Sequence, residues 1–498
     1  MKGSLLVAGT TSDAGKSVVT TGLCRLLARR GVRVAPFKAQ NMSNNSMVVA
    51  GPGGLGAEIG RAQWIQAVAA GVTPEVAMNP VLLKPGSDRR SHVVLNGLPA
   101  GSITSAEFAG SRRALSEAAY AAYDDLVSRF DVVICEGAGS PTEINLREHD
   151  FINLGLARHA DMPVIVVGDI DRGGLYAALH GTVALLEPAD QRLVAGFVVN
   201  KFRGDETLLE PANREIERIT GRPVLGVIPW SPDVWLDSED GLDVAARSAD
   251  VEHPFVVAVV RFPRISNFTD LDALGLEPDV DVRFASRPQD LADADLVVLP
   301  GTRSTIADLA WLRHRGLDAA VVDHAAAGRP VLGICGGYQM LGRTISDPDG
   351  VEGPAGTVVA GLGLLDTTTT FAREKVLRLS QGIALGARVS GYEIHHGVTH
   401  PSGGDEFFGG ARREHVLGTM VHGTLESDEF RRNLLAFVAA TVGRPYAATE
   451  VSFEAARRAR LDLLADLIEA HVDVAAIESL INGGAPSGLP VLPPGDSR

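Results

Sequence analysis

Cys335 stands in a sequence context that suits a nucleophile. It follows an apolar run at residues 331–334, and Gly336 and Gly337 come directly after it, before a helical pattern. A strand that turns sharply into a helix exposes the side chain at the turn, and the helix N-terminus favours a thiolate there. Backbone N–H groups at the same turn can bind an oxyanion. The pattern therefore predicts a nucleophilic cysteine with Gly336 in its oxyanion hole.

The cysteine needs a base, and three histidines could supply it. His422 follows an apolar run at residues 416–421 and begins a Gly-containing turn, so its side chain can reach the tip of a sheet. His395 and His396 are adjacent, so in an extended segment they point to opposite faces and at most one could face the cysteine. We favour His422 as the base. Gly301 follows another apolar run and could add a second N–H group to the oxyanion hole.

A second kind of chemistry is indicated near the N-terminus. Residues 9–17 read Gly-Thr-Thr-Ser-Asp-Ala-Gly-Lys-Ser and lie between an apolar run and a helical pattern. Glycine lets the backbone N–H groups turn toward phosphate oxygens, and the helix N-terminus adds positive charge. Five residues separate the two glycines, where the usual P-loop has four. We expect Lys16 to reach the phosphates of ATP and Ser17 to bind Mg²⁺. The predicted ATP-binding residues in this loop are Asp13, Ala14, Gly15, Lys16 and Ser17.

Three further polar positions follow apolar runs. Glu136 ends one run and precedes Gly-Ala-Gly, which suits a second Mg²⁺ contact, although a helix cap could use the same carboxylate. Asn200 ends another run, where its amide could bind the adenine base. Residues 38–45, Lys-Ala-Gln-Asn-Met-Ser-Asn-Asn, form either a polar loop or a clamp for carboxylates or phosphates.

These residues require parallel strands that end at a common edge. Short apolar runs alternate with helical patterns up to about residue 228, and the same alternation resumes after a polar, turn-rich segment at 229–254. We predict an α/β chain of two domains, 1–235 and 250–445, each with a mainly parallel sheet flanked by helices. Residues 446–498 are expected to form a helical tail and a Gly/Pro-rich end, with 483–498 disordered. The expected strands are 5–8, 33–37, 132–135, 164–167, 194–199, 224–228, 256–260, 280–284, 296–299 and 331–334, and the expected helices are 17–30, 175–186, 305–313, 317–327, 430–441 and 453–481.

Composition excludes several classes of protein. The 498 residues carry a net charge of −15, which disfavours a general nucleic-acid binder. No run approaches the length of a membrane span, and the N-terminus lacks the long apolar region of a signal peptide. Three scattered cysteines indicate neither a disulfide framework nor a zinc site. We expect a cytoplasmic enzyme whose substrates are small molecules.

At these residues the sequence resembles known families. The Cys335 segment with His422 resembles the class I, or triad, glutamine amidotransferases. Residues 9–17 with Glu136 resemble the ATP site of dethiobiotin synthetase, which shares the longer loop spacing. The two together, with the amide-rich residues 38–45 and the Gly-Tyr-Glu-Ile-His-His-Gly segment at 391–397, are similar to the cobyric acid synthase family of cobalamin biosynthesis. The resemblance runs from about residue 3 to about residue 445.

The resemblance implies a reaction and its cofactors. Adenosylcobyrinic acid a,c-diamide would be amidated on its b, d, e and g carboxylates, each step using one glutamine and one ATP with Mg²⁺. Many triad enzymes place a glutamate two residues after the histidine, but Thr424 occupies that position here. The group that orients His422 is therefore unassigned. Glu426 is a candidate by proximity, and a Cys–His dyad is the alternative.

Other functions would leave part of this pattern unused. A cobyrinic acid a,c-diamide synthase would have the same two halves but different target carboxylates, and residues 38–45 favour cobyric acid synthase over it. A partitioning-type P-loop ATPase, which acts as a switch for partner proteins, would not explain the turn at Cys335. A binding-only amidotransferase domain would not need both Cys335 and His422.

Overall fold

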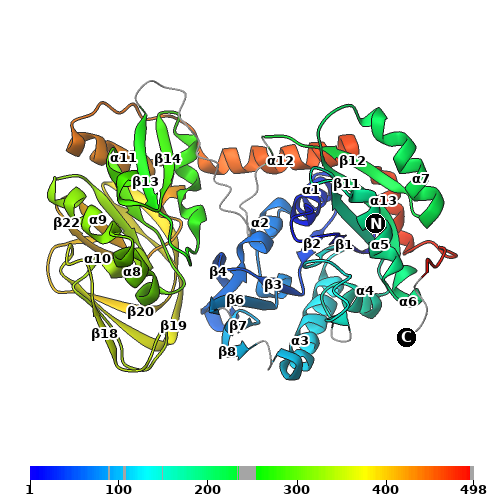
Figure 1. The fold of residues 1–498 in the computed structure, drawn as a ribbon, viewed down its shortest axis with the longest axis horizontal. Helices are drawn as coiled ribbons and strands as arrows, with labels where there is room; N and C mark the ends of the chain where they lie inside the picture. Colours follow the sequence, from blue (N-terminus) through cyan, green and yellow to red (C-terminus); the bar gives the residue numbers. More distant parts are fainter. Residues whose placement is uncertain (88–89, 105–107, 148–149, 233, 235–253, 494–498) are drawn as a thin grey trace. The chain divides into compact units, whose positions relative to one another are not determined.

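The computed structural model describes residues 1–87, 90–104, 108–147, 150–232, 234 and 254–493. The chain divides into two compact units, coloured by sequence in Figure 1. The first unit contains Met1–Ser43, Glu58–Asp240 and Arg457–Arg498, and the second contains Asn44–Ala57 and Gly241–Ala456. Asn44–Ala57 therefore belongs to the second unit although its sequence neighbours on both sides belong to the first, and Arg457–Arg498 returns to the first unit. Most of the predicted boundary segment, 235–253, lies outside the described residues.

The first unit is built on a sheet of six parallel strands. Because apolar strands in a parallel sheet are covered on both faces, the uniformly apolar runs of the sequence form its centre, and β1 is almost wholly buried. The strand order is β12-β11-β10-β1-β9-β2. The strands are β1 (Gly3–Gly9), β2 (Val34–Phe37), β9 (Val132–Glu136), β10 (Val164–Asp169), β11 (Val194–Phe202) and β12 (Val224–Pro229). The α-helices that this unit takes from the first half of the chain are α1 (Lys16–Arg29), α2 (Arg61–Ala69), α3 (Phe108–Arg129), α4 (Leu154–Ala160), α5 (Leu175–Ala184), α6 (Pro188–Gln191) and α7 (Glu210–Thr220).

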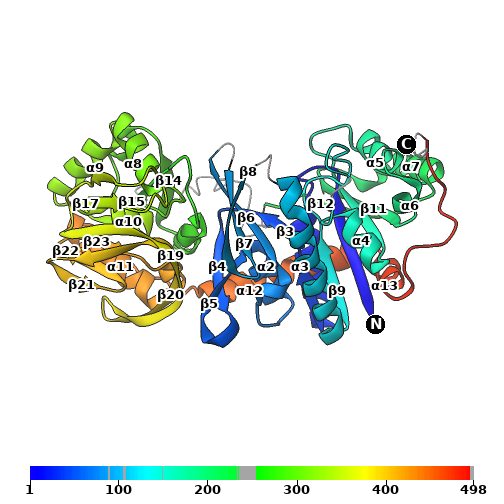
Figure 2. The ribbon, with the colours of Figure 1, turned by 90° about the horizontal axis from the view of Figure 1, so that it is seen from below.

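A smaller sheet, which the sequence did not indicate, holds part of the amide-rich segment. Its order is β3-β6-β7-β8, and Figure 2 shows these strands together. Strand β3 runs parallel to β6, with Gln40 opposite Val81. The strands are β3 (Gln40–Met42), β6 (Val81–Ser87), β7 (Arg90–Leu95) and β8 (Leu98–Thr104). A two-stranded ribbon of β4 (Ser46–Ala50) and β5 (Gly56–Gly60) follows β3 in the chain.

The second unit contains a seven-stranded sheet in the order β14-β13-β15-β16-β23-β22-β21. The first five are parallel, and β22 and β21 add an antiparallel edge. A second sheet, β18-β17-β19-β20, includes the long β19–β20 hairpin. The strands are β13 (Phe255–Val260), β14 (Val280–Ala285), β15 (Leu296–Leu299), β16 (Val331–Ile334), β17 (Thr344–Asp347), β18 (Thr357–Ala360), β19 (Thr367–Ala384), β20 (Ala387–Pro401), β21 (Asp405–Phe407), β22 (Gly410–Arg413) and β23 (Val416–Thr419), and the helices are α8 (Thr305–His314), α9 (Leu317–Ala326), α10 (Gly336–Leu341) and α11 (Asp428–Val442).

The predicted fold class is confirmed, because each unit contains a mainly parallel sheet with helices packed on it. The ten strands expected from apolar runs are all present, with ends that differ by a few residues. Among the helices that the structure describes, none is both long and apolar enough to cross a bilayer.

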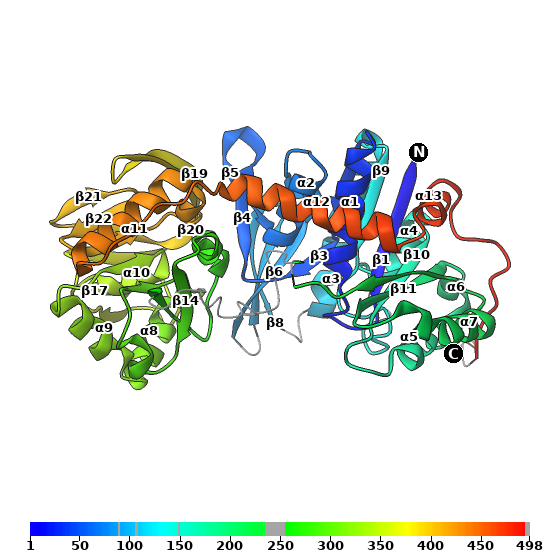
Figure 3. The same ribbon diagram turned by 90° about the horizontal axis from the view of Figure 1, so that it is seen from above.

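The helical tail is part of the first unit from residue 457 onward. The predicted single helix at 453–481 is wrong: it is two helices, α12 (Phe453–His471) and α13 (Val474–Gly483), because Asp473 accepts a hydrogen bond from the N–H group of Ala476 and starts a new helix. Helix α12 packs along α1 (Figures 1 and 3), where a Cβ atom on Gly22 would lie 2.5 Å from the side chain of Ile468.

The chain beyond α13 is also packed against the first unit. Leu492 is buried, its N–H group donates to the side-chain oxygen of Gln191, and its carbonyl accepts from the Gln191 amide nitrogen. The prediction of disorder for 483–498 is therefore wrong as far as residue 493. A Gly/Pro-rich composition lowers helix and strand propensity, but it does not prevent an extended segment from being held by side-chain hydrogen bonds.

The tail should therefore contribute to the stability of the first unit. We expect Ile468→Ala to lower the free energy of unfolding of this unit by about 2–5 kcal/mol, because the isoleucine side chain is fully buried against α1. Hydrogen exchange of β1 and α1 amides across a denaturant series would measure the change. Val491→Ala, at a half-exposed side chain of the same tail, is the control and should have little effect. Equal protection in the two variants would contradict a core role for α12.

Candidate active sites

The loop between β1 and α1 has the backbone shape of a phosphate-binding turn. Gly15 has φ 101°, a value that favours glycine, and a Cβ atom there would lie 1.9 Å from the Asn200 side-chain nitrogen. That nitrogen donates to the carbonyl of Ala14 at 3.0 Å. Asn200, at the carboxyl half of β11, thus supports the loop directly. The side chain that we expected to bind adenine has its amide nitrogen engaged on the loop.

Two lysine ammonium groups contact backbone carbonyls of the loop. The Lys16 ammonium donates to the carbonyl oxygens of Thr11 (2.8 Å), Ser12 (3.1 Å) and Gly139 (3.1 Å). The Lys201 ammonium donates to the carbonyl of Asp13 at 2.8 Å and also pairs with Asp169 at 2.8 Å. The loop therefore gathers two ammonium groups, which suits a polyanionic ligand.

Glu136 connects three elements of the first unit. Its carboxylate accepts from the Ser17 hydroxyl (2.9 Å), the Lys38 ammonium (2.9 Å) and the Gln66 amide (2.5 Å). Burial by itself would raise the pKa of Glu136, but the charge of Lys38 and the hydrogen bonds from Lys38 and Gln66 outweigh it and lower the pKa. The buried carboxyl is therefore an anion, and its donors come from α1, α2 and the residue after β2.

The Ser17 and Glu136 oxygens fit the requirements of Mg²⁺. They lie 2.9 Å apart at the end of the phosphate loop, on separate elements. The described residues contain no cluster of three or more His, Cys, Asp or Glu that could hold a metal. Mg²⁺ needs no such cluster, because it binds through one or two protein oxygens with phosphates and waters. A cation here would share the Glu136 oxygen that Lys38 now contacts.

In the second unit, Cys335 occupies a strained turn between β16 and α10. Its φ of 50° and ψ of −109° are unfavourable for a residue with a Cβ atom. The turn is held by a 2.7 Å hydrogen bond from its N–H group to the carbonyl of Thr419 and by close packing behind it, where a Cβ atom on Gly337 would lie 1.9 Å from the Leu299 carbonyl. The sequence predicted this geometry from the small residues around the cysteine.

His422 lies beside Cys335 and is buried with it. The imidazole follows β23, the strand next to β16, and its side chain is 1% exposed. Cys335 is close enough to the imidazole to help raise the pKa of His422. The structure therefore brings together the predicted nucleophile and the favoured histidine at the ends of neighbouring strands.

Asp270 is the partner of His422 that the sequence did not reveal. A carboxylate oxygen of Asp270 lies 2.6 Å from Nδ1 of His422, and the other accepts from the N–H group of Gly423 at 2.8 Å. Asp270 lies in the short helix η5 (Phe268–Leu276), which follows β13. It takes the position next to the imidazole for which Glu426 was the sequence candidate. The one available signal was an acidic residue after a predicted strand.

The charge of Asp270 determines the protonation of His422. Burial by itself would lower the pKa of the imidazole, but Asp270 and Cys335 outweigh it and raise the pKa to about 10. At neutral pH the ring is therefore an imidazolium, with Asp270 on one side and sulfur on the other. A cation in this position stabilises the thiolate form of the cysteine.

The two candidate oxyanion glycines lie next to this group. A Cβ atom on Gly301 would be 2.7 Å from Cε1 of His422, and one on Gly336 would be 3.2 Å from the N–H nitrogen of Thr302. Glycine at 301 thus allows the backbone after β15 to approach the imidazole. Gly301 therefore lies beside the imidazole, and Gly336 follows Cys335 directly in the chain.

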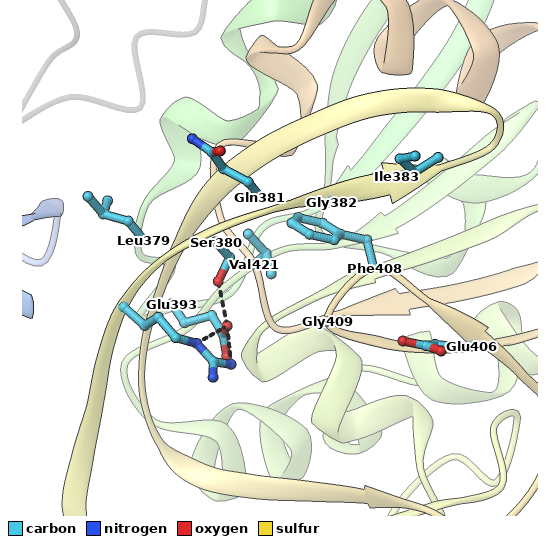
Figure 4. A pocket seen from close by; sticks show the side chains of 11 residues that line it. Leu379, Ser380, Gln381, Gly382, Ile383, Glu393, Glu406, Phe408, Gly409 and Val421 are labelled. Atoms are coloured by element: carbon cyan, nitrogen blue, oxygen red, sulfur yellow. Dashed lines mark hydrogen bonds and ion pairs between the residues drawn. The ribbon is translucent and has the colours of Figure 1, made fainter.

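His395 and His396 have other partners. The His395 ring contacts Glu393 at 3.2 Å, and the His396 ring contacts the carbonyl of Ala372 at 3.2 Å. Glu393 also accepts from Arg378 and from the Ser380 hydroxyl, as Figure 4 shows. These groups overcome the effect of burial and lower the pKa of Glu393 to about 2. His395 therefore belongs to the ion-pair cluster of Glu393, and His396 contacts the backbone of the β19–β20 hairpin.

A pocket of about 620 Å³ lies beside that cluster (Figure 4). Arg378 and Glu393 form its polar wall, Phe408 packs over Gly382, and Val421, the residue before His422, reaches it. The side chains of Cys335 and His422 are not among its lining residues.

The comparisons with known proteins match both halves of the chain. Residues 5–244 match the family described as CobQ/CobB/MinD/ParA nucleotide binding domain, and residues 256–430 match the CobB/CobQ-like glutamine amidotransferase domain. The chain is 66% identical over 492 residues to the cobyric acid synthase of Mycolicibacterium gilvum, 64% over 492 residues to that of Mycobacterium ulcerans and 65% over 494 residues to that of Mycobacterium tuberculosis. Each alignment covers 99% of this chain and 99% of the relative.

The chain belongs to the cobyric acid synthase family. The resemblance predicted from residues 9–17 and from the Cys335 segment is therefore confirmed. A solved structure of a glutamine amidotransferase covers 38% of this chain and 98% of its own, at 18% identity and a TM-score of 0.29. The cobyric acid synthase match spans both units, so the nucleotide-binding and amidotransferase parts belong to one family assignment.

The arrangement around His422 predicts a strong effect of Asp270→Asn. Without the carboxylate charge, the pKa of His422 falls, the imidazolium no longer stabilises the thiolate at neutral pH, and glutamine hydrolysis should drop by about 10²- to 10⁴-fold in kcat. Alkylation of Cys335 by iodoacetamide should move to higher pH. Cys24 and Cys135 are fully buried, and Cys335→Ala gives the background labelling.

Glu426→Gln separates the two candidate partners of His422. We expect this variant to hydrolyse glutamine at nearly the normal rate, because Asp270 contacts Nδ1. A larger loss in Glu426→Gln than in Asp270→Asn would show that the sequence candidate, and not Asp270, orients the base.

Proposed function

We propose that the protein amidates the b, d, e and g carboxylates of adenosylcobyrinic acid a,c-diamide, with ATP and glutamine, to give adenosylcobyric acid. Membership of the cobyric acid synthase family supports the substrate. The observation that carries the chemistry is the Cys335–His422–Asp270 group in the same chain as a phosphate loop. A partner-binding ATPase has no use for the first of these.

The second unit supplies ammonia. The Cys335 thiolate attacks the side-chain amide carbon of glutamine, and N–H groups of Gly301 and Gly336 stabilise the oxyanion. His422, already protonated, gives its proton to the departing ammonia, and Asp270 stabilises the ring in its orientation. His422 then takes a proton from water, which attacks the glutamyl thioester and releases glutamate, so that the thiolate is restored.

The first unit activates the acceptor. A carboxylate is a poor electrophile, so the γ-phosphoryl group of ATP is transferred to it to form an acyl phosphate, with ADP as leaving group. Lys16 neutralises charge on the transferred group, and its present contacts with loop carbonyls are exchanged for phosphate oxygens. Ser17 and Glu136 would hold Mg²⁺, which supplies charge neutralisation on the phosphates. Ammonia then displaces phosphate and forms the amide.

The substrate assignment has a direct assay. Mass spectrometry of corrinoid products formed with ATP and glutamine should show four added amides when adenosylcobyrinic acid a,c-diamide is the acceptor. Conversion of cobyrinic acid only as far as its a,c-diamide would assign the protein to the other corrinoid amidation.

Cys335→Ala should separate the two nitrogen sources. The variant loses glutamine-dependent amidation, because no other group forms the glutamyl thioester, but it keeps amidation supported by a high concentration of ammonium salt. Product formation with each donor measures this. Equal loss with both donors would contradict the division between the two units.

Lys16→Ala should have the complementary effect. We expect amidation to fall by about 10²-fold or more with either nitrogen donor at saturating ATP, because Lys16 acts on the phosphoryl group and not on nitrogen supply. Glutamine hydrolysis in the absence of the corrinoid serves as the control for an intact second unit. A near-normal rate with ammonia would show that residues 9–17 do not bind the reacting phosphates.

A further inference from the structure

Asn45 is joined to the Asp270 segment by hydrogen bonds although the two lie far apart in the sequence. The side-chain oxygen of Asn45 accepts from the N–H group of Asn267 at 2.7 Å. In return, the side-chain oxygen of Asn267 accepts from the N–H group of Ser46 at 3.0 Å. Asn45, Ser46 and Asn267 are each less than 5% exposed. Asn45 and Ser46 thus hold Asn267 by two reciprocal, buried hydrogen bonds, which we call the clasp.

The clasp acts on a residue whose backbone needs support. Asn267 has φ 50° and ψ 38°, left-handed values that are tolerated by asparagine but are less favourable than ordinary helical ones. Its carbonyl accepts from the N–H group of Asp270 at 3.0 Å, so it begins the turn that carries the carboxylate. The position of the Asp270 side chain therefore depends on the backbone conformation of Asn267.

The same segment touches the candidate oxyanion loop. The N–H group of Ser266 donates to the carbonyl of Gly301 at 2.9 Å, and Ile265 forms a bridge with Thr302. Asn267 is thus the junction between Asp270 on one side and the loop of Gly301 on the other. A shift of this junction would move the orienting carboxylate and the oxyanion donors together.

We propose that Asn45 is a positioning residue of the glutaminase site: through Asn267 it fixes Asp270 against His422. This inference rests on the proposed hydrolysis of glutamine at Cys335. It assigns to Asn45, the last of the amide-rich residues, a task different from binding carboxylates or phosphates. Seven residues before Asn45 in the chain, Lys38 contacts Glu136 of the phosphate site, so one short segment serves both units.

The test compares Asn45→Ala with Asn45→Asp in the full chain. Asn45→Ala removes the acceptor for the Asn267 N–H group and should lower kcat for glutamine hydrolysis about 10- to 100-fold, since small displacements of catalytic groups have effects of this size. Asn45→Asp retains a side-chain oxygen at that position and should recover part of the loss. Alkylation of Cys335 should shift to higher pH in Asn45→Ala, in the direction set by a weaker Asp270–His422 contact.

Asn433→Ala is the matched control. Asn433, in α11 of the same unit, also makes a side-chain hydrogen bond to backbone, at 2.9 Å to the carbonyl of Leu385. Its removal should lower thermal stability to a similar extent but leave kcat and the alkylation profile unchanged. Ammonia-supported amidation should be normal in the Asn45 variants, because the acyl phosphate is formed in the other unit.

A double-variant cycle with Asp270→Asn decides the route. If Asn45 acts through Asp270, Asn45→Ala adds little further loss of kcat in the Asp270→Asn background. An undiminished loss in that background, or an alkylation profile identical to wild type in Asn45→Ala, would overturn the proposal. Failure of the wild-type protein to hydrolyse glutamine would instead refute the proposed function, and the alkylation profiles would still report on the clasp.

Discussion

The second unit is organised around the buried hydrogen bond between Asp270 and His422. Both side chains are almost completely buried, and an ionised carboxylate or imidazolium is costly to bury unless each charge has a partner. Asp270 meets this requirement with two donors, Nδ1 of His422 and the N–H group of Gly423. The ends of β13 and β23 must therefore stay in register with each other, and the strained turn at Cys335 lies between the strands that carry them. The contact that neutralises the two buried charges is therefore also the contact that fixes the positions of Asp270 and His422.

A comparable constraint acts in the first unit. Glu136 is a buried carboxylate whose donors belong to three different elements, so its neutralisation fixes α1, α2 and the segment after β2 around the phosphate loop. In both units the chemistry-bearing residues follow the carboxyl ends of adjacent parallel strands, as expected for open α/β sheets. The difference lies in what the charges do. Asp270 makes a cation beside the proposed nucleophile, whereas Glu136 remains an anion near the proposed site for phosphate and Mg²⁺.

Much of this arrangement could be predicted from local patterns. Uniform apolar runs identified the central strands, because strands buried on both faces leave no polar alternation. Gly336 and Gly337 beside Cys335, and Gly15 in the phosphate loop, indicated tight turns that a residue with a side chain would not permit. Asp270 could not be found in this way, because its contact with His422 spans 152 residues and leaves no periodic signal. The small sheet containing β3 and the packing of α12 on α1 are likewise tertiary effects. The C-terminal segment near Leu492 was missed because composition describes propensity, not the partners that a folded chain offers.

Amide-rich residues 38–45 illustrate the limit of reading function from composition. Their density of polar groups suggested a ligand site, and the Lys38 ammonium does donate a hydrogen bond to Glu136, beside the phosphate loop. Asn45, at the end of this segment, and Ser46, directly after it, belong to the second unit and form hydrogen bonds there with Asn267. One polar segment is therefore divided between two tasks, and only the three-dimensional contacts separate them.

The most direct test of this account is an NMR titration of His422 in the intact protein, with ¹⁵N-labelled histidine and the His422→Gln variant to assign its signals. We expect the ring nitrogens to report an imidazolium throughout the neutral range and to titrate near pH 10, because the charges of Asp270 and Cys335 outweigh the effect of burial. A midpoint at or below the ordinary value of 6.5 would contradict the account, since His422 would then be neutral at the pH where it must stabilise the thiolate.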